Sequence, residues 1–222
     1  MNDKCGENNK VEFGREELVQ HYRNTTLHGF FVDLVPLSEK YAKEIVDLRN
    51  TERALHNLSQ QYKLTEEKQI AWTKEYFIRN NDLYWCILDK KGDFLGTYRA
   101  YNMDFEKNTA EVGSTVMLES RAKERPYFLE ATLIVHDFLF CTMGITAVVA
   151  HIRKDNVKVR SFDAHIGAIE RGETLIYGTQ YIETYISKDM FSRDKLKKIL
   201  DHWIFRENKR DINNKNKQYL KN

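Results

Sequence analysis

The sequence predicts a single α/β domain, and three observations lead to this prediction. Short apolar runs typical of strands alternate with longer amphipathic segments typical of helices. One run, I-T-A-V-V-A-H at residues 145–151, is apolar nearly throughout, as strands inside parallel sheets are. The chain has 222 residues, of which 41% are hydrophobic and 12% aromatic, enough for a sizeable core within one domain.

The first elements are expected after an N-terminal extension of residues 1–28. A mostly apolar run at residues 30–35 predicts a buried strand, and Pro36 ends it. Ser38 can cap the helix that follows, because its hydroxyl can accept a hydrogen bond from a free N–H group of the first turn. Thr65 begins a second helix for the same reason.

An antiparallel meander is expected next, from strand-like runs at residues 83–88, 94–101 and 110–118. The polar segment D-K-K-G-D between the first two runs is a hairpin signal. The segment at residues 126–140 is apolar nearly all round. In a globular protein this pattern indicates a helix buried on most sides.

The C-terminal part repeats the alternation. After the apolar strand, residues 156–166 predict a short helix that ends at Gly167, where glycine can adopt the left-handed cap conformation. Two strand-like stretches, at residues 173–177 and 180–186, precede a last helix. Residues 207–222 contain five Lys or Arg and five Asn and are expected as a disordered polar tail. The expected domain therefore spans residues 29–206.

Composition and charge exclude several functional classes. Thirty-five Lys and Arg against 33 Asp and Glu give a net charge of +2, so no nucleic-acid partner is expected. No run approaches the ~18 apolar residues of a membrane span, and because the N-terminus is polar we expect no signal peptide there. We therefore expect no membrane partner and a cytoplasmic location. The three cysteines include no C-x-x-C pair, so no metal site is expected.

The most specific local motif is N-V-K-V-R-S-F-D-A-H-I-G-A at residues 156–168. This motif and the order of elements resemble the GNAT superfamily of N-acetyltransferases, especially its branch of ribosomal-protein and nucleotide-sugar acyltransferases. The similarity covers roughly residues 29–190, although Ala168 stands where the family usually has an aromatic residue. The resemblance implies a mixed, mostly antiparallel sheet flanked by helices, with two parallel strands that splay apart. Acetyl-CoA or another short acyl-CoA would lie in the splay as co-substrate.

The resemblance also implies which residues bind the acyl donor. The backbone of Val116 and Met117 would bind the pantetheine amides and stabilise the oxyanion of the tetrahedral intermediate. Asn156 and Phe162 match positions that line the pantetheine arm.

The pyrophosphate loop departs from the family, because R-A-K-E-R-P replaces a loop rich in glycine. Glycines there let backbone N–H groups approach the phosphates. Arg121, Lys123 and Arg125 could compensate through their charge, or could form an ordinary solvated turn.

Two carboxylates are candidate catalytic residues. Glu111 stands where the family sometimes places a general base, and Asp163 occupies the position of a tyrosine that often protonates the leaving thiolate. The alternatives are a solvated strand end for Glu111 and a helix-surface position for Asp163. Strand alternation further predicts that Glu111 and Met117 share one face of their strand and Val112 the other.

Acceptor recognition is expected from the first two helices and the link between them, with Tyr84 of the first meander strand nearby. Arg49 could meet a diphosphate, polar side chains could bind hydroxyl groups, and aromatic rings could stack on a sugar or base. Plain core packing is the alternative for the aromatic residues. The candidates are Arg49, Asn50, His56, Gln69, Trp72 and Tyr84.

The predicted function is transfer of an acetyl or short (hydroxy)acyl group from acyl-CoA to the amine of a dTDP-linked amino-dideoxy sugar, in the biosynthesis of a surface polysaccharide such as O-antigen. The nature of the acceptor rests on the resemblance. One alternative is an enzyme that acetylates protein N-termini or a small amine, which would have an acidic acceptor groove. Another is a catalytically silent protein that binds acyl-CoA as a regulator. A homodimer is compatible with each.

Overall fold

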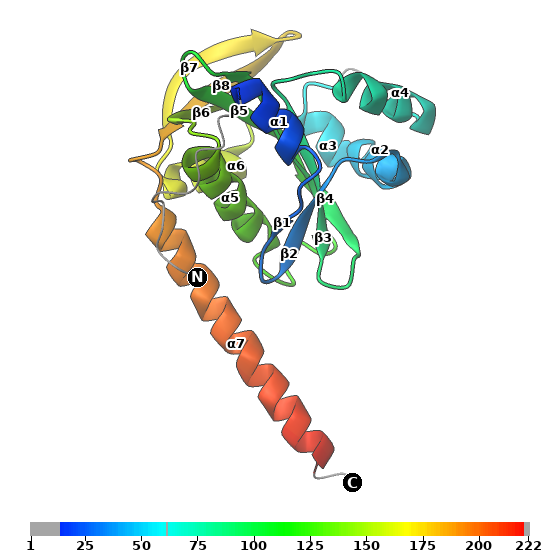
Figure 1. The fold of residues 1–222 in the computed structure, drawn as a ribbon, viewed down its shortest axis with the longest axis vertical. Helices are drawn as coiled ribbons and strands as arrows, with labels where there is room; N and C mark the ends of the chain where they lie inside the picture. The colour runs from blue at the N-terminus through cyan, green and yellow to red at the C-terminus, as the bar shows by residue number, and fades with distance from the viewer. Residues whose placement is uncertain (1–13, 61, 220–222) are drawn as a thin grey trace.

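An eight-stranded sheet with helices on both faces organises the protein (Figure 1). The structure, a computed structural model, describes residues 14–60 and 62–219. Its elements are α1 (Arg15–Tyr22), β1 (Leu27–His28), β2 (Val32–Pro36), η1 (Glu39–Tyr41), α2 (Ala42–Arg49), α3 (Glu52–Asn57), α4 (Glu66–Tyr76), β3 (Leu83–Asp89), β4 (Phe94–Asp104), β5 (Thr109–Met117), α5 (Tyr127–Asp137), η2 (Phe138–Thr142), β6 (Ala147–Arg153), α6 (Val157–Ile166), β7 (Ile169–Ile176), β8 (Thr179–Ser187) and α7 (Arg193–Tyr219). The predicted α/β class is confirmed.

The strands follow the order β1-β2-β3-β4-β5-β6-β8-β7. All neighbours are antiparallel except β5 and β6, which pair in parallel over three residues only. The last of these pairs joins Glu111 to Val149, although β5 continues to Met117 and β6 to Arg153. The two strands therefore splay apart beyond Glu111, which confirms the mixed sheet with a splayed parallel pair.

A bulge in β5 changes which side chains face each side of the sheet. One residue of β4 lies opposite both Ser114 and Thr115, and Ser114 has a positive φ of 49°. A bulge shifts the alternation by one residue. Met117 therefore packs in the same core cluster as Val112, whereas Val116 packs against α2 and α3 on the other face. The prediction that Met117 and Val112 lie on opposite faces is wrong for this reason.

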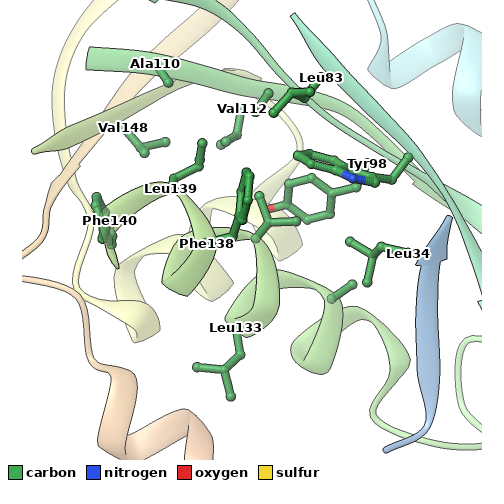
Figure 2. Packing of buried hydrophobic residues seen from close by; sticks show 14 of the residues in the cluster. Leu34, Leu83, Tyr98, Ala110, Val112, Leu133, Phe138, Leu139, Phe140 and Val148 are labelled. Carbon is green, nitrogen blue, oxygen red and sulfur yellow. The ribbon is translucent and has the colours of Figure 1, made fainter. Parts of the chain in front are cut away.

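The main core lies between one face of the sheet and the helices α1, α5, α6 and α7. Figure 2 shows how Phe138 and Leu139 of η2 face Val112 and Val148 of the sheet, whereas Leu133 of α5 points away from the sheet. A smaller cluster on the other face joins the sheet to α2 and α4. The buried helix predicted at residues 126–140 is confirmed, and its last turn is a π-helix, η2.

A charged residue lies within the buried face of α5. Glu130 is 2% exposed, and its carboxylate accepts hydrogen bonds from the backbone N–H groups of Phe30 at 2.6 Å, Phe31 at 2.7 Å and Val32 at 2.9 Å. Burial raises the pKa of Glu130, while the three N–H groups oppose this rise. Gly29 makes room, since a Cβ there would lie 2.7 Å from the Glu130 carboxyl carbon. The start of β2 is thereby fixed to α5.

Both ends of the chain differ from the expected domain limits. Val19 of α1 is fully buried in the main core and β1 pairs with β2, so part of the expected extension packs against the domain. Its residues 1–13 lie outside the described residues. Helix α7 projects away from the sheet (Figure 1) and continues through residues 207–219, which were expected to be disordered. Among the described residues, no helix is both long and apolar enough to cross a membrane.

Candidate functional site

A cleft opens where β5 and β6 separate. Its empty volume is about 790 Å³, part of which is open to solvent. Its walls come from β4, β5, β6, β8, α5 and α6, and the end of α3 lies at its mouth. The cleft therefore follows the splay and reaches from the main core to the face of the sheet that carries α2–α4.

Polar side chains gather where the two strands separate. Glu111 Oε1 accepts a hydrogen bond from the Tyr101 hydroxyl at 2.7 Å and lies 2.9 Å from His151 Nδ1. Glu111 Oε2 accepts a hydrogen bond from Asn102 Nδ2 at 3.0 Å. The other ring nitrogen of His151, Nε2, lies 3.7 Å from Glu183 Oε2. These side chains are only partly exposed, 14% for Glu111 and 25% for His151.

The register of the sheet explains this arrangement. Parallel pairing places Glu111 beside Val149, and His151, two residues further along β6, points to the same face as Val149. Burial and the neighbouring Glu111 carboxylate raise the pKa of Tyr101, so its hydroxyl stays protonated and donates to Glu111. Gly113 leaves space for this ring, because a Cβ there would lie 2.9 Å from the Tyr101 hydroxyl oxygen.

The pair of Glu111 and His151 can act as a proton acceptor. We assign the Nδ1 hydrogen of His151 to the hydrogen bond with Glu111, which leaves Nε2 as a lone-pair acceptor. At 3.7 Å, Glu183 is too distant to occupy Nε2 with a hydrogen bond. Sequence reasoning missed His151. The available signal was a histidine at the end of an apolar strand that would lie parallel to the strand carrying Glu111.

Asp163 lies on another wall of the cleft, on α6. Burial raises its pKa from 3.8 to about 6, and this rise is opposed by a hydrogen bond that Thr184 Oγ1 donates to Asp163 Oδ2 at 3.0 Å. Close to neutral pH, more of this carboxyl group is therefore protonated than for an ordinary aspartate. Asp163 can serve as a proton donor inside the cleft.

Two of the predicted donor-binding side chains line the cleft. Asn156 Oδ1 accepts a hydrogen bond from the Val159 N–H at 3.4 Å and so caps α6. Phe162 packs against Phe128 of α5, with 4.8 Å between the ring centroids.

The backbone positions predicted for the donor lie elsewhere. Val116 and Met117 are outside the cleft lining, which on β5 is formed by residues 112–115. The Met117 carbonyl also accepts a hydrogen bond from Arg53 Nη2.

The basic residues predicted for the phosphates follow β5, in the turn before α5. Arg121 and Arg125 are both paired with carboxylates, Arg121 with Asp89 at 2.8 Å and Arg125 with Glu207 at 2.5 Å. Lys123 is exposed. The three residues therefore lie in one turn, but the side chains of the two arginines point toward carboxylates of the protein.

Of the predicted acceptor-binding residues, His56 is the one beside the cleft mouth. Its Nε2 lies 3.1 Å from Asp155 Oδ2, and its carbonyl accepts a hydrogen bond at 2.9 Å from Arg153, which lines the cleft. Arg49 donates a hydrogen bond to Gln60 at 3.0 Å.

The other four acceptor candidates are used within the fold. The amide of Asn50 makes two hydrogen bonds to the backbone of residue 64. Gln69 is 5% exposed and Tyr84 3% exposed, and Trp72 packs on the same cluster as Tyr84. For the two aromatic residues, core packing is the alternative that the structure supports. Among residues 14–60 and 62–219, no group of three or more His, Cys, Asp or Glu could hold a metal ion.

Several solved acetyltransferase structures resemble this chain in fold. A crystal structure of a GCN5-related N-acetyltransferase from Brucella melitensis has 18% identity and a TM-score of 0.67, covering 81% of this chain and 85% of that one. Apo FdhC, described as a nucleotide-linked sugar GNAT, has 23% identity and a TM-score of 0.68, covering 80% and 98%. Spermidine N-acetyltransferase from Vibrio cholerae, solved with CoA and spermine, has 13% identity and a TM-score of 0.65, covering 72% and 96%.

These identities establish similarity of fold. No curated protein matches the sequence. The model of the acetyltransferase (GNAT) domain matches residues 32–169, more than half of the chain and the whole stretch from β2 to the end of α6. The splayed strands, the cleft between them and this match agree, and the chain belongs to the GNAT acetyltransferase family.

Proposed function

We propose that this protein is an acyl-CoA-dependent N-acyltransferase whose reaction takes place where β5 and β6 separate. The observation that carries the proposal is the hydrogen-bonded pair of Glu111 and His151 at the point where the cleft passes through the sheet. An amine is protonated in water near neutral pH, so it must lose a proton before it can attack a thioester. The pair supplies an acceptor for that proton.

Three side chains near the cleft, those of His151, Glu111 and Asp163, can carry the proton transfers of this reaction. His151 Nε2 takes the proton from the acceptor amine, and Glu111, bonded to Nδ1, orients the ring and stabilises the imidazolium that forms. The amine nitrogen attacks the thioester carbonyl, the tetrahedral intermediate releases the second proton of that nitrogen to solvent, its C–S bond breaks, and the thiolate leaves. Asp163, with its pKa of about 6, can give that thiolate a proton.

The oxyanion of the intermediate needs a hydrogen-bond donor in the cleft. We assign this donor to the backbone of β5 at residues 112–115, which lines the cleft beside the unpaired edge of the strand. Val116 and Met117 lie beyond this stretch. The assignment moves the predicted oxyanion site by a few residues toward Glu111 and keeps its chemistry.

The acceptor class we propose is a nucleotide-linked amino-dideoxy sugar, used in the biosynthesis of a surface polysaccharide. Similarity to FdhC supports this choice. Arg153 and His56 at the cleft mouth are suited to the phosphates of such a nucleotide, a role that sequence reasoning gave to Arg49. Asp155, which pairs with both side chains, would be partly displaced by those phosphates.

A small cationic amine is the second candidate, and one observation favours it. Three carboxylates, those of Glu111, Asp155 and Glu183, lie around His151, His56 and Arg153. Carboxylates near the mouth would attract a polyamine or a protein N-terminus. The two candidates thus differ in whether the cationic or the anionic groups of the mouth contact the acceptor.

A direct assay separates these possibilities. The purified chain is incubated with acetyl-CoA and, in turn, a dTDP-amino-dideoxyhexose, spermidine and a short peptide with a free N-terminus. Thiol release gives the rate and mass spectrometry identifies the product. We expect the amino sugar to have a kcat/KM at least about 100-fold above the other two. A preference for spermidine or the peptide would contradict the sugar assignment. Binding of CoA without turnover on any amine would support a silent regulator instead.

A further inference from the structure

The turn before α5, residues 119–125, is closed on itself. The N–H groups of Arg121, Ala122 and Glu124 donate hydrogen bonds to carbonyl groups within residues 118–121, at 3.1 to 3.3 Å. A phosphate cradle needs several N–H groups that point together toward one ligand. Three amides of this turn are already used by the turn itself.

Arg121 is held by a carboxylate that the fold requires. Asp89 Oδ2 pairs with Arg121 at 2.8 Å, while Asp89 Oδ1 accepts hydrogen bonds from the Lys91 and Asp93 N–H groups in the β3–β4 turn. Burial raises the pKa of Asp89, but the Asp93 N–H and Arg121 outweigh this and the net shift is downward. The Asp89 side chain is 7% exposed. Moving Arg121 onto a phosphate would leave a buried carboxylate without its cation, which is unfavourable.

The other cations of the turn are balanced in the same way. Arg125 pairs with Glu207 of α7 at 2.5 Å and donates to the Glu124 carbonyl at 2.7 Å. Arg121 also pairs with Glu124 at 2.7 Å. Carboxylates and cations are equal in number here. The five carboxylates are Glu119, Glu124, Asp89, Asp93 and Glu207, and the five cations are Arg121, Lys123, Arg125, Arg53 and Arg210. A diphosphate would meet no excess of positive charge.

The cleft itself differs from the turn. Most of its wall is apolar, from side chains such as Phe128, Val159 and Phe162, and unpaired strand edges lie beside it. A pantetheine arm has two amide groups separated by short aliphatic segments, which suit a narrow apolar channel bordered by free peptide groups. The cleft therefore suits the pantetheine arm of acyl-CoA, whereas the turn before α5 does not suit its diphosphate.

We propose that this protein recognises its acyl donor through the acyl-pantetheine arm, and that the nucleotide diphosphate contributes little to binding. This inference rests on the proposed function and refines its donor. The shared chemistry is a pantetheine thioester, which can come from acyl-CoA or from the phosphopantetheine group of a carrier protein. The reaction is unchanged: the C–S bond breaks, the amide bond forms, and the thiol is released.

Calorimetric titration of the full chain with CoA and with pantetheine tests the proposal. We expect the two dissociation constants to agree within about tenfold at the same ionic strength, and raising the salt concentration to change them little. Binding of CoA about 1,000-fold more tightly than pantetheine, with the difference removed by Arg121→Ala, would overturn the inference. Failure of both ligands to bind would instead contradict the proposed function.

Variants that remove negative charge beside Arg121 sharpen the test. Asp93 and Glu124 are its more exposed partners, with 60% and 43% of their side chains exposed. If charge balance weakens contact with the diphosphate, D93N with E124Q should tighten CoA binding several-fold and leave pantetheine binding unchanged. D47N, which removes an exposed carboxylate on α2, is the matched control and should change neither. Equal tightening of both ligands by the double variant would count against the inference.

Titration with a carrier protein identifies which molecule supplies the pantetheine arm. Titration with a holo acyl carrier protein, compared with its apo form, measures whether the phosphopantetheine group is accepted when protein replaces the nucleotide. Tighter binding of the holo form than of pantetheine would identify a carrier protein as the source. Binding comparable to pantetheine would identify free thioesters, including acyl-CoA. Both results support recognition of the arm, whereas exclusion of the holo form together with strong preference for CoA would contradict it.

Discussion

Two glutamates of this protein, one buried and one partly exposed, lie in contrasting surroundings. Glu130 is 2% exposed and all three of its partners are backbone N–H groups. The Glu111 side chain is 14% exposed and is bonded to the side chains of Tyr101, Asn102 and His151, of which His151 lines the cleft. Backbone partners cannot rotate away, so they fix a carboxylate and the segment around it. Side-chain partners can exchange protons, so they suit a carboxylate that takes part in a reaction.

The largest effect should follow from Glu130→Ala. Three buried N–H groups would lose their acceptor, and the free energy of unfolding should fall by about 3–5 kcal/mol. Denaturant titration measures it, and CoA binding by the folded fraction should persist. Glu75→Ala, which removes an exposed glutamate on α4, should cost no more than about 0.5 kcal/mol. A loss below about 1 kcal/mol for Glu130→Ala would show that solvent replaces these bonds easily.

Glu111→Gln should have the opposite effect, with a large loss of activity and little loss of stability. The amide cannot stabilise the imidazolium of His151, and kcat for acetyl transfer should fall about 100-fold, within the usual range for general base catalysis. The denaturation midpoint should stay close to that of the natural protein. Glu106→Gln, at an exposed position in the β4–β5 turn, should leave both quantities unchanged. If Glu111→Gln destabilises the fold and leaves kcat intact, the contrast between the two glutamates is wrong.

Asp163, a third carboxylate, should affect how the free energy of unfolding depends on pH. The pKa of Asp163 is about 6 in the folded protein against 3.8 normally, because of burial. The folded state therefore binds more protons between these pH values, and the free energy of unfolding falls as the pH rises through them and levels off above. Asp163→Asn should remove this decrease, which is on the order of 3 kcal/mol. Asp201→Asn, at an exposed position on α7, should leave it in place. Equal pH dependence in all three proteins would contradict the raised pKa.

Tyr101→Phe should give the smallest change. It removes one of the three hydrogen bonds that hold the Glu111 carboxylate and leaves the ring in place. We expect kcat/KM to fall by about tenfold or less, since a single hydrogen bond contributes about 1 kcal/mol. Steady-state kinetics with the best acceptor measures it. A loss as large as that of Glu111→Gln would mean that Tyr101 itself takes part in proton transfer.

Local patterns in the sequence were enough to predict most of the elements from β2 to β8. Thr65 and Ser38 accept hydrogen bonds from the N–H groups of Lys68 and Lys40 as the expected caps, and Gly167 has a φ of 103° at the end of α6. These signals depend on neighbours a few residues away. The apolar strand and the buried helix α5 were predicted for the same reason.

The site depended on contacts that local patterns do not contain. Glu111 and His151 are 40 positions apart and meet only because β5 and β6 pair in parallel. The bulge that moves Met117 to the main core occurs at a serine, a residue with no strong preference for positive φ. Gln69 and Tyr84 have side chains suited to binding a sugar, but composition alone could not show that the fold buries them.

The contact between Glu130 and the start of β2 also determines the order in which the protein can be completed during synthesis. Its partners precede it by 98 to 100 positions. At a translation rate of about 5–20 residues per second, the N–H groups of Phe30, Phe31 and Val32 wait roughly 5–20 s for their acceptor. Until α5 leaves the ribosome, α1 is the one described helix that can cover the apolar face of the sheet from β1 to β5. The N-terminal half of the nascent chain therefore exposes apolar surface that only the emergence of α5 can bury.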